Sequence, residues 1–134
     1  MFRVINVTKT FLPDYQLYSS YLKRAWDAVW LTNRGELTLE LEEKIKKKYS
    51  INHIIITNNG TIPIQIALKL LGNQGEIITT PFSYVATTSA IIWENCKPVF
   101  LDIHPELLTI DETKIEAAIT RKSTAMLATH SFGN

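Results

Sequence analysis

The amino-acid sequence predicts an α/β protein with an open, mostly parallel sheet and helices on its faces. From residue 53 onward, four short apolar runs with strand character alternate with three segments of helical periodicity. Such alternation is typical of parallel sheets whose strands are joined by helices. Before residue 50, only helical patterns occur. We therefore expect a helical segment over residues 1–50 and the first part of an α/β domain over residues 51–134, truncated at its C-terminus.

The first part of the chain predicts two helices. Residues 1–12 have no clear periodicity and are expected to be extended or irregular. Pro13-Asp14 is a suitable helix start, and apolar residues recur at helical spacing from Tyr15 to Trp30. After a break at residues 32–35, a second helix is expected from Glu36 to Tyr49, since leucine and isoleucine recur every fourth residue and its last turn is basic.

The second part predicts alternating elements of both kinds. Strands are expected where β-branched and apolar residues cluster, over residues 53–57, 76–80, 98–102 and 123–129. Helices are expected between them, over residues 61–71, 83–94 and 111–119. Ligands of such sheets bind beyond the carboxyl ends of the strands, so the residues that follow each strand are the candidates for chemistry.

Composition excludes several functional classes. The chain has 134 residues, of which 46% are hydrophobic and 20% charged, and its net charge is +1. A nearly neutral chain gives no electrostatic reason to expect binding to nucleic acid or to an acidic membrane. No apolar run approaches the roughly 20 residues of a membrane helix, and the N-terminus lacks a signal-peptide core. The single cysteine, Cys96, excludes an internal disulfide, and we expect a cytoplasmic protein.

The most informative segment runs from His53 to Leu71. Three isoleucines end at Asn58-Asn59-Gly60-Thr61, and a helical pattern follows at once. The first N–H groups of a helix have no partner within it, and the helix dipole adds positive potential there. A strand, a small polar turn and a helix start therefore predict a site for an anion such as a phosphate.

Common cofactor motifs are absent, which narrows the choice of ligand. The sequence has neither the glycine fingerprint of dinucleotide-binding proteins nor a P-loop. Its three histidines lack metal-ligand spacing, so no metal is expected. What remains is Gly60 and Thr61, suited to a phosphate, and Tyr84 after the next strand, whose ring can cover a flat heterocycle. One phosphate site beside one aromatic ring suits pyridoxal phosphate better than a nucleotide.

Six short motifs occur in the same order in one known enzyme family. They are Trp30-Leu31-Thr32-Asn33, Asn59-Gly60-Thr61, Glu76-Ile77-Ile78-Thr79-Thr80-Pro81, Tyr84-Val85-Ala86-Thr87, Pro98-Val99-Phe100-Leu101-Asp102-Ile103 and the closing His130-x-x-Gly133-Asn134. By these motifs the chain resembles the N-terminal portion of the DegT/StrS-type sugar aminotransferases, which use pyridoxal phosphate. The resemblance implies the first part of the large, cofactor-binding domain of the aspartate-aminotransferase-like fold, also called fold type I.

The resemblance also implies an activity and site residues. The parent enzyme would transfer an amino group from an amino acid, expected to be glutamate, to a nucleotide-linked keto-sugar, and would form a homodimer. Gly60 and Thr61 would hold the cofactor phosphate, Tyr84 would lie against the pyridine ring, and Thr32 and Asn33 would approach the substrate. The chain departs from the family pattern at Glu36, where proline is common, and at Pro63, where a small residue is usual.

The family's catalytic lysine, and the aspartate that pairs with the pyridine nitrogen, have no counterpart in this sequence. Asp102 belongs to an earlier motif of the family and is not assigned that role. We therefore expect no catalytic residue in the chain and no transaminase activity from these 134 residues alone.

Other interpretations stay open at the level of the sequence. The chain could be a non-catalytic α/β partner module, a relative of the sugar dehydratases that use the same cofactor, or a small nucleotide-binding domain. Each site residue also has an ordinary structural explanation. Gly60-Thr61 would also suit a plain turn with a helix cap, and Tyr84 would also suit packing on the sheet.

Overall fold

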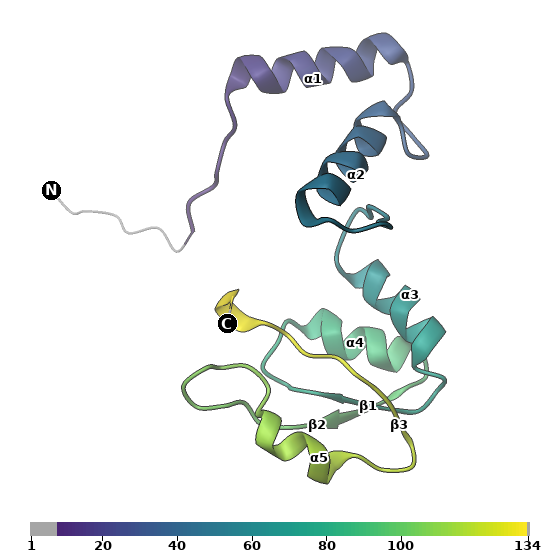
Figure 1. Ribbon diagram of the computed structural model, residues 1–134, viewed down its shortest axis with the longest axis vertical. Helices are drawn as coiled ribbons and strands as arrows, with labels where there is room; N and C mark the ends of the chain where they lie inside the picture. Colours follow the sequence, from purple (N-terminus) through teal and green to yellow (C-terminus); the bar gives the residue numbers. More distant parts are fainter. Residues whose placement is uncertain (1–7, 134) are drawn as a thin grey trace, which may run out of the picture. The chain divides into compact units, whose positions relative to one another are not determined.

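The computed structural model describes residues 8–133 and divides the chain into two compact units, residues 1–56 and 57–134. The described part of the first unit holds two helices, α1 (Tyr15–Ala28) and α2 (Glu36–Tyr49) (Figure 1). The Asp14 side chain caps α1 by accepting the N–H of Leu17 at 2.9 Å. Arg24 of α1 donates to Glu36 and Glu40 of α2, so charged side chains link the two helices.

The second unit is a three-stranded parallel sheet with helices on both faces. Its strands are β1 (Glu76–Thr79), β2 (Lys97–Phe100) and β3 (Ser123–Met126), in the spatial order β2-β1-β3. Its helical elements are α3 (Thr61–Leu71), α4 (Val85–Trp93), η1 (Glu112–Lys114), α5 (Ile115–Ala118) and η2 (Ser131–Gly133).

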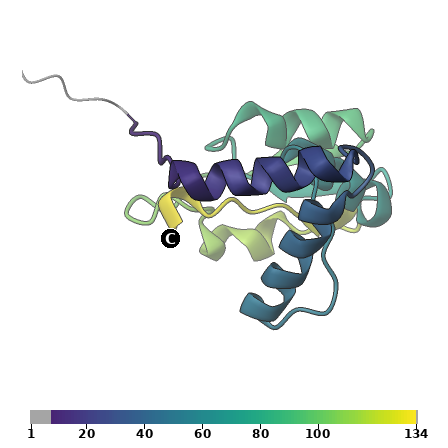
Figure 2. The same cartoon turned by 90° about the horizontal axis from the view of Figure 1, so that it is seen from above.

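The strand order explains where the helices lie. The chain moves from β1 to β2 through α4, and then returns past β1 to β3 through α5. Because crossovers between parallel strands are right-handed, moves in opposite directions place their helices on opposite faces of the sheet. Figures 1 and 2 show α4 and α5 on opposite sides of the strands.

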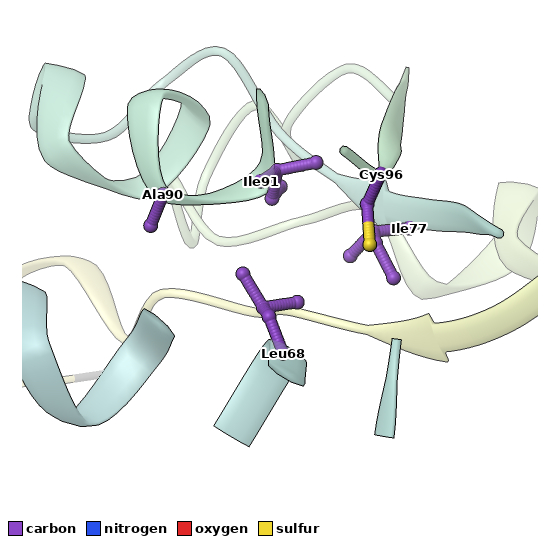
Figure 3. Packing of buried hydrophobic residues seen from close by; sticks show 5 residues of the cluster. All are labelled: Leu68, Ile77, Ala90, Ile91 and Cys96. Carbon is purple, nitrogen blue, oxygen red and sulfur yellow. The ribbon is translucent and has the colours of Figure 1, made fainter. Parts of the chain in front are cut away.

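The core of the second unit lies between the sheet and the pair α3 and α4. Ile77 of β1 packs there with Leu68 of α3, with Ala90 and Ile91 of α4, and with Cys96, and all five are buried (Figure 3). Helix α3 ends at Gly72, where a Cβ atom would lie 2.7 Å from the Cys96 sulfur. Glycine is therefore required at that end because the chain passes directly against the core.

The fold class predicted from the sequence is confirmed, and the helices of residues 36–49 and 61–71 form with those bounds. The expected helix at residues 15–30 ends at Ala28, because Val29 adopts a left-handed conformation with φ of 50°. The expected helix of residues 83–94 spans residues 85–93, and that of residues 111–119 is a 3-10 turn followed by one short helix. Residues 1–12 are expected to be extended or irregular. Of these, residues 1–7 lie outside the described residues, and residues 8–12 form no helix or strand.

The predicted strand at residues 53–57 is wrong, since this segment forms no strand and the sheet has three strands instead of four. A β-strand exists only where a neighbouring strand takes up its backbone hydrogen bonds. No described segment pairs with residues 53–57, and Ile55 is 78% exposed. The three isoleucines favour a strand, but this segment does not form one because it has no neighbouring strand among the described residues. The other strands are confirmed, although each is four residues long.

We expect truncation of Ile91 to destabilise the second unit. The Ile91 side chain is fully buried, so the Ile91→Ala variant leaves a cavity against β1. Its free energy of unfolding should fall by about 2–5 kcal/mol, measured by urea denaturation with circular dichroism.

The matched control is the adjacent Ile92→Ala, because Ile92 is 57% exposed. Its effect should stay below about 0.5 kcal/mol. Equal effects of the two substitutions would contradict the packing described here.

Candidate functional site

The candidate site lies at the edge of the sheet where the parallel strands end. Five residues separate the end of β1 from the start of α4, so the N-terminus of α4 lies at this edge. Four residues separate the end of α3 from the start of β1, and α3 packs beside α4, so the N-terminus of α3 lies toward the same edge. The strand order also changes direction here, because the chain leaves β1 toward β2 while β3 lies on the other side of β1. Open α/β sheets bind ligands at such places.

Gly60 and Thr61 lie at the N-terminus of α3, as the sequence predicts for an anion site. Gly60 is the residue before the first helical turn, and Thr61 is the first residue of the helix. Gly60 has an ordinary φ of −80°, and a Cβ atom there would meet no other atom within 4 Å. Neither backbone strain nor crowding by the described residues requires glycine here. The space beside Gly60 is therefore open to a ligand.

The Asn59 side chain caps the N-terminus of α3. Its Oδ1 atom accepts the N–H of Thr61 at 2.9 Å and the N–H of Ile62 at 3.1 Å. Pro63, two residues after Thr61, has no N–H to offer. Two amide donors therefore converge on one oxygen atom, the arrangement by which a helix start binds an oxygen of a phosphate.

Tyr84 lies at the start of α4, where its side chain makes no capping hydrogen bond and is 81% exposed. It lines an open groove of about 360 Å³ between the segments that follow β1 and β3. Two other aromatic side chains, Phe82 and Phe132, also line this groove. Phe132 has a left-handed φ of 57° and is 83% exposed. The groove thus offers apolar ring faces at the edge of the sheet where α3 and α4 begin.

Thr32 and Asn33, predicted to lie on the substrate side, belong to the first unit. They lie in the loop between α1 and α2, and both are exposed. Asn33 and Arg34 adopt left-handed conformations, with φ of 54° and 59°. The structure brings Gly60, Thr61 and Tyr84 to one edge of the second unit, whereas the substrate-side pair belongs to the first.

The lysines of the second unit are not suited to act as a nucleophile at this edge. Lys97 and Lys122 lie at the amino ends of β2 and β3, and Lys69 lies in the last turn of α3. Lys114 follows the carboxyl end of β2, but its ammonium group lies 2.9 Å from Asp111. Its hydrogen bond to Asp111 raises the pKa of Lys114, so the amine stays protonated.

Sequence reasoning included Asn59 in a motif but assigned no role to its side chain, and it missed Phe132. An asparagine within two residues of a helix start often accepts the first helical N–H groups, so the sequence held the information for Asn59. Phe132 gave no such signal, because its place in the groove depends on the pairing of β3 beside β1.

Among the described residues, no group of three or more histidine, cysteine, aspartate or glutamate side chains could hold a metal ion. No helix in the described part of the chain has the length and apolar character needed to span a membrane.

Comparison with curated proteins gives relatives of one kind. The chain is 44% identical over 130 residues to the dTDP-4-amino-4,6-dideoxy-D-glucose transaminase of Escherichia coli, covering 97% of this chain and 35% of that protein. It is 40% identical over 134 residues to the enzyme of the same name from Shigella dysenteriae, covering 100% of this chain and 36% of that protein. The chain thus spans about a third of the length of these relatives.

Solved structures share the fold. DesI, crystallised in the presence of its TDP-sugar product, superposes on this chain with a TM-score of 0.81 at 32% identity. The match covers 90% of this chain and 31% of DesI. NtdA of Bacillus subtilis, with the cofactor pyridoxamine phosphate (PMP) bound, gives a TM-score of 0.83 at 27% identity and covers 91% of this chain and 29% of NtdA.

The family comparison covers most of the sequence. The model of the DegT/DnrJ/EryC1/StrS aminotransferase family matches residues 16–134. This match includes all six motifs noted in the sequence and confirms the resemblance that they indicated. The chain belongs to the DegT/DnrJ/EryC1/StrS aminotransferase family.

Proposed function

We propose that the chain forms part of a pyridoxal-phosphate-dependent enzyme that transfers an amino group from an amino acid to a nucleotide-linked keto-sugar. Glutamate is the expected donor. The observation that carries this proposal is the pair of amides of Thr61 and Ile62, which converge on one acceptor oxygen at the edge where Tyr84 lies. Family membership and the names of the relatives, which are transaminases of a dTDP-linked sugar, support it.

The residues at the site fit the phosphate of this cofactor. A phosphate oxygen could replace the Asn59 oxygen, because the N–H groups of Thr61 and Ile62 already point to a single acceptor. The α3 dipole favours a negative charge there, and the space beside Gly60 is open. The Thr61 hydroxyl follows directly on this pair of amides and offers a further donor.

Each part of the chain then has a defined task. Thr61 and Ile62 hold the phosphate after the Asn59 side chain turns away, and Tyr84 lies against the ring. Thr32 and Asn33 approach the sugar nucleotide. When bound, the cofactor supplies an electron-accepting ring that stabilises negative charge at the amino carbon. The protein groups named here bind and orient it.

The assembled protein is proposed to be a homodimer. Large apolar side chains support this, since they are exposed on several helices, including Trp26 of α1, Leu70 of α3 and Trp93 of α4. A monomeric protein rarely leaves so many large apolar groups exposed. The cytoplasmic location expected from the sequence stays a prediction.

We expect the chain to bind pyridoxamine phosphate through its phosphate group. The test uses this amine form because it does not react with lysine side chains as the aldehyde form does. Titration of the ¹⁵N-labelled chain should shift the amide signals of Thr61 and Ile62, whereas pyridoxamine without the phosphate should not. Equal binding of both ligands, or shifts elsewhere only, would contradict the proposal.

The ring contact is tested with two variants of Tyr84. The Tyr84→Ala variant should bind pyridoxamine phosphate about fivefold to tenfold more weakly, because it removes an aromatic face. Tyr84→Phe keeps that face and should bind as the unchanged chain does. Isothermal calorimetry measures both affinities, and an equal loss in both variants would mean that the hydroxyl group is responsible instead.

Asn59→Ala should separate helix capping from cofactor binding. Loss of the cap should lower the free energy of unfolding by about 0.5–2 kcal/mol, measured by urea denaturation. The same change frees the amides of Thr61 and Ile62, so pyridoxamine phosphate should bind at least as tightly as before. Asn59→Asp is the control, since a carboxylate oxygen at this position can still accept the N–H groups of Thr61 and Ile62 and so keeps the cap. Weaker binding by Asn59→Ala would mean that Asn59 itself holds the ligand.

We propose that the 134 residues alone do not catalyse amino transfer. Lys97 and Lys122 lie at the wrong ends of their strands, and Lys114 is paired with Asp111. Incubation of the purified chain with the cofactor, glutamate and a dTDP-linked 4-keto-sugar should yield no amino sugar by mass spectrometry. Continued turnover would contradict this expectation.

A further inference from the structure

Glu42 of α2 is the one glutamate of the first unit whose side chain is withdrawn from solvent among the described residues. Its exposed fraction is 1%, whereas its neighbour Glu43 is exposed. A charged side chain is almost never fully buried unless it is paired. The reason for the burial of Glu42 must therefore lie in its partners.

Both partners of Glu42 lie outside α2. One oxygen, Oε2, accepts a hydrogen bond from the Arg34 guanidinium at 2.5 Å, and the other, Oε1, accepts the N–H of Ile56 at 3.3 Å. Arg34 belongs to the loop that precedes α2, and Ile56 to the segment that follows it. One carboxylate thus binds the chain on both sides of its own helix.

The loop that contains Arg34 has little else to hold it. Asn33 and Arg34 are consecutive non-glycine residues with left-handed φ values, a conformation that costs free energy for each of them. Within the described part of the chain, the backbone of residues 31–34 makes no hydrogen bond to other backbone groups. Such a conformation persists only where surrounding contacts determine it, and the polar contact that holds this loop is the one between Arg34 and Glu42.

We propose that Glu42 is a positioning residue that fixes the loop of Thr32 and Asn33 by binding Arg34. The loop is held in its left-handed conformation by a charged hydrogen bond to a carboxylate that is itself immobilised in α2. The relevance of this to catalysis rests on the proposed function, in which Thr32 and Asn33 approach the sugar nucleotide. The ordering of the loop does not depend on that function.

The test compares two isosteric substitutions in neighbouring positions. Glu42→Gln keeps the shape and an acceptor for Ile56 but removes the charge that binds Arg34. Glu43→Gln is the matched control, since Glu43 is exposed and its ion pair is with Lys46 in the same helix. Circular dichroism first establishes that both variants retain their helices.

The first readout is backbone order measured by ¹⁵N relaxation. In the unchanged chain and in Glu43→Gln, the order parameters of Asn33 and Arg34 should be about 0.85. In Glu42→Gln they should fall below about 0.6, while those of α1 and α2 stay unchanged. Exchange of the Ile56 amide hydrogen should become about tenfold faster, because a neutral acceptor is weaker than a charged one. Unchanged loop order in Glu42→Gln, or an equal loss throughout both helices, would overturn the inference.

The second readout is a pH profile, which a residue that only fills space would not produce. Arg34, then the Ile56 amide and the charge of Lys46, lower the pKa of Glu42 below its ordinary value of 4.5 against the opposing effect of burial. Loop order should therefore be complete above pH 4.5 and decline as the pH falls through the lowered pKa. Glu42→Gln should show no such step. A step of the same size in that variant would overturn the inference.

The inference and the proposed function fail in different measurements. Titration with a dTDP-linked sugar should shift the amide signals of Thr32 and Asn33, and Glu42→Gln should weaken this binding several-fold. Loop order that depends on Glu42, together with shifts at other residues only, would support the positioning role and refute the substrate-side role of the loop. Binding at Thr32 and Asn33 that is equal in Glu42→Gln and the unchanged chain would overturn the positioning role.

Discussion

The arrangement of the second unit depends on the burial of β1. All four residues of this strand are buried, so both of its faces must be covered and both of its edges paired. Strands β2 and β3 pair its edges, and helices lie on both faces of the sheet. With parallel strands and right-handed crossovers, this requirement leaves the helix starts at the edge where the strands end. The position of the candidate site is therefore a consequence of how one buried strand is covered.

Two kinds of chemical group make up the candidate site. Backbone amides at the start of α3 suit a phosphate, and aromatic side chains after β1 and β3 suit a flat ring. No amine of the second unit is both unpaired and at this edge among the described residues. Such a distribution fits a chain that spans about a third of the length of its relatives. In the proposed function, this part of the chain contributes to binding the cofactor.

Patterns confined to one element were predicted well from the sequence. The helix of residues 36–49 follows from leucine and isoleucine at every fourth position, and Gly72 marks the end of the helix of residues 61–71. Gly60, Thr61 and Tyr84 also fall where the alternation of elements placed them, at the starts of α3 and α4. These features depend on neighbours in the sequence, which a periodic pattern records.

Features that depend on distant partners were not predictable. The isoleucines of residues 54–56 have strand propensity, but a strand also needs a neighbour, and the described residues provide none. Glu42 looks like any other charged residue of a helix rich in glutamate and lysine. Its burial follows only from Arg34 before the helix and Ile56 after it. Phe132 likewise acquires its place from the pairing of β3 with β1.

The position of β3 has a consequence for how this sheet can grow. Among the described residues, strand β3 pairs with β1 on one side only, and its side chains alternate between half-buried and exposed, with Met126 half exposed. The backbone amides and carbonyls of its outer side are therefore a template for another strand. Any extended segment that reaches this margin can join the sheet through main-chain bonds alone, with little demand on its sequence.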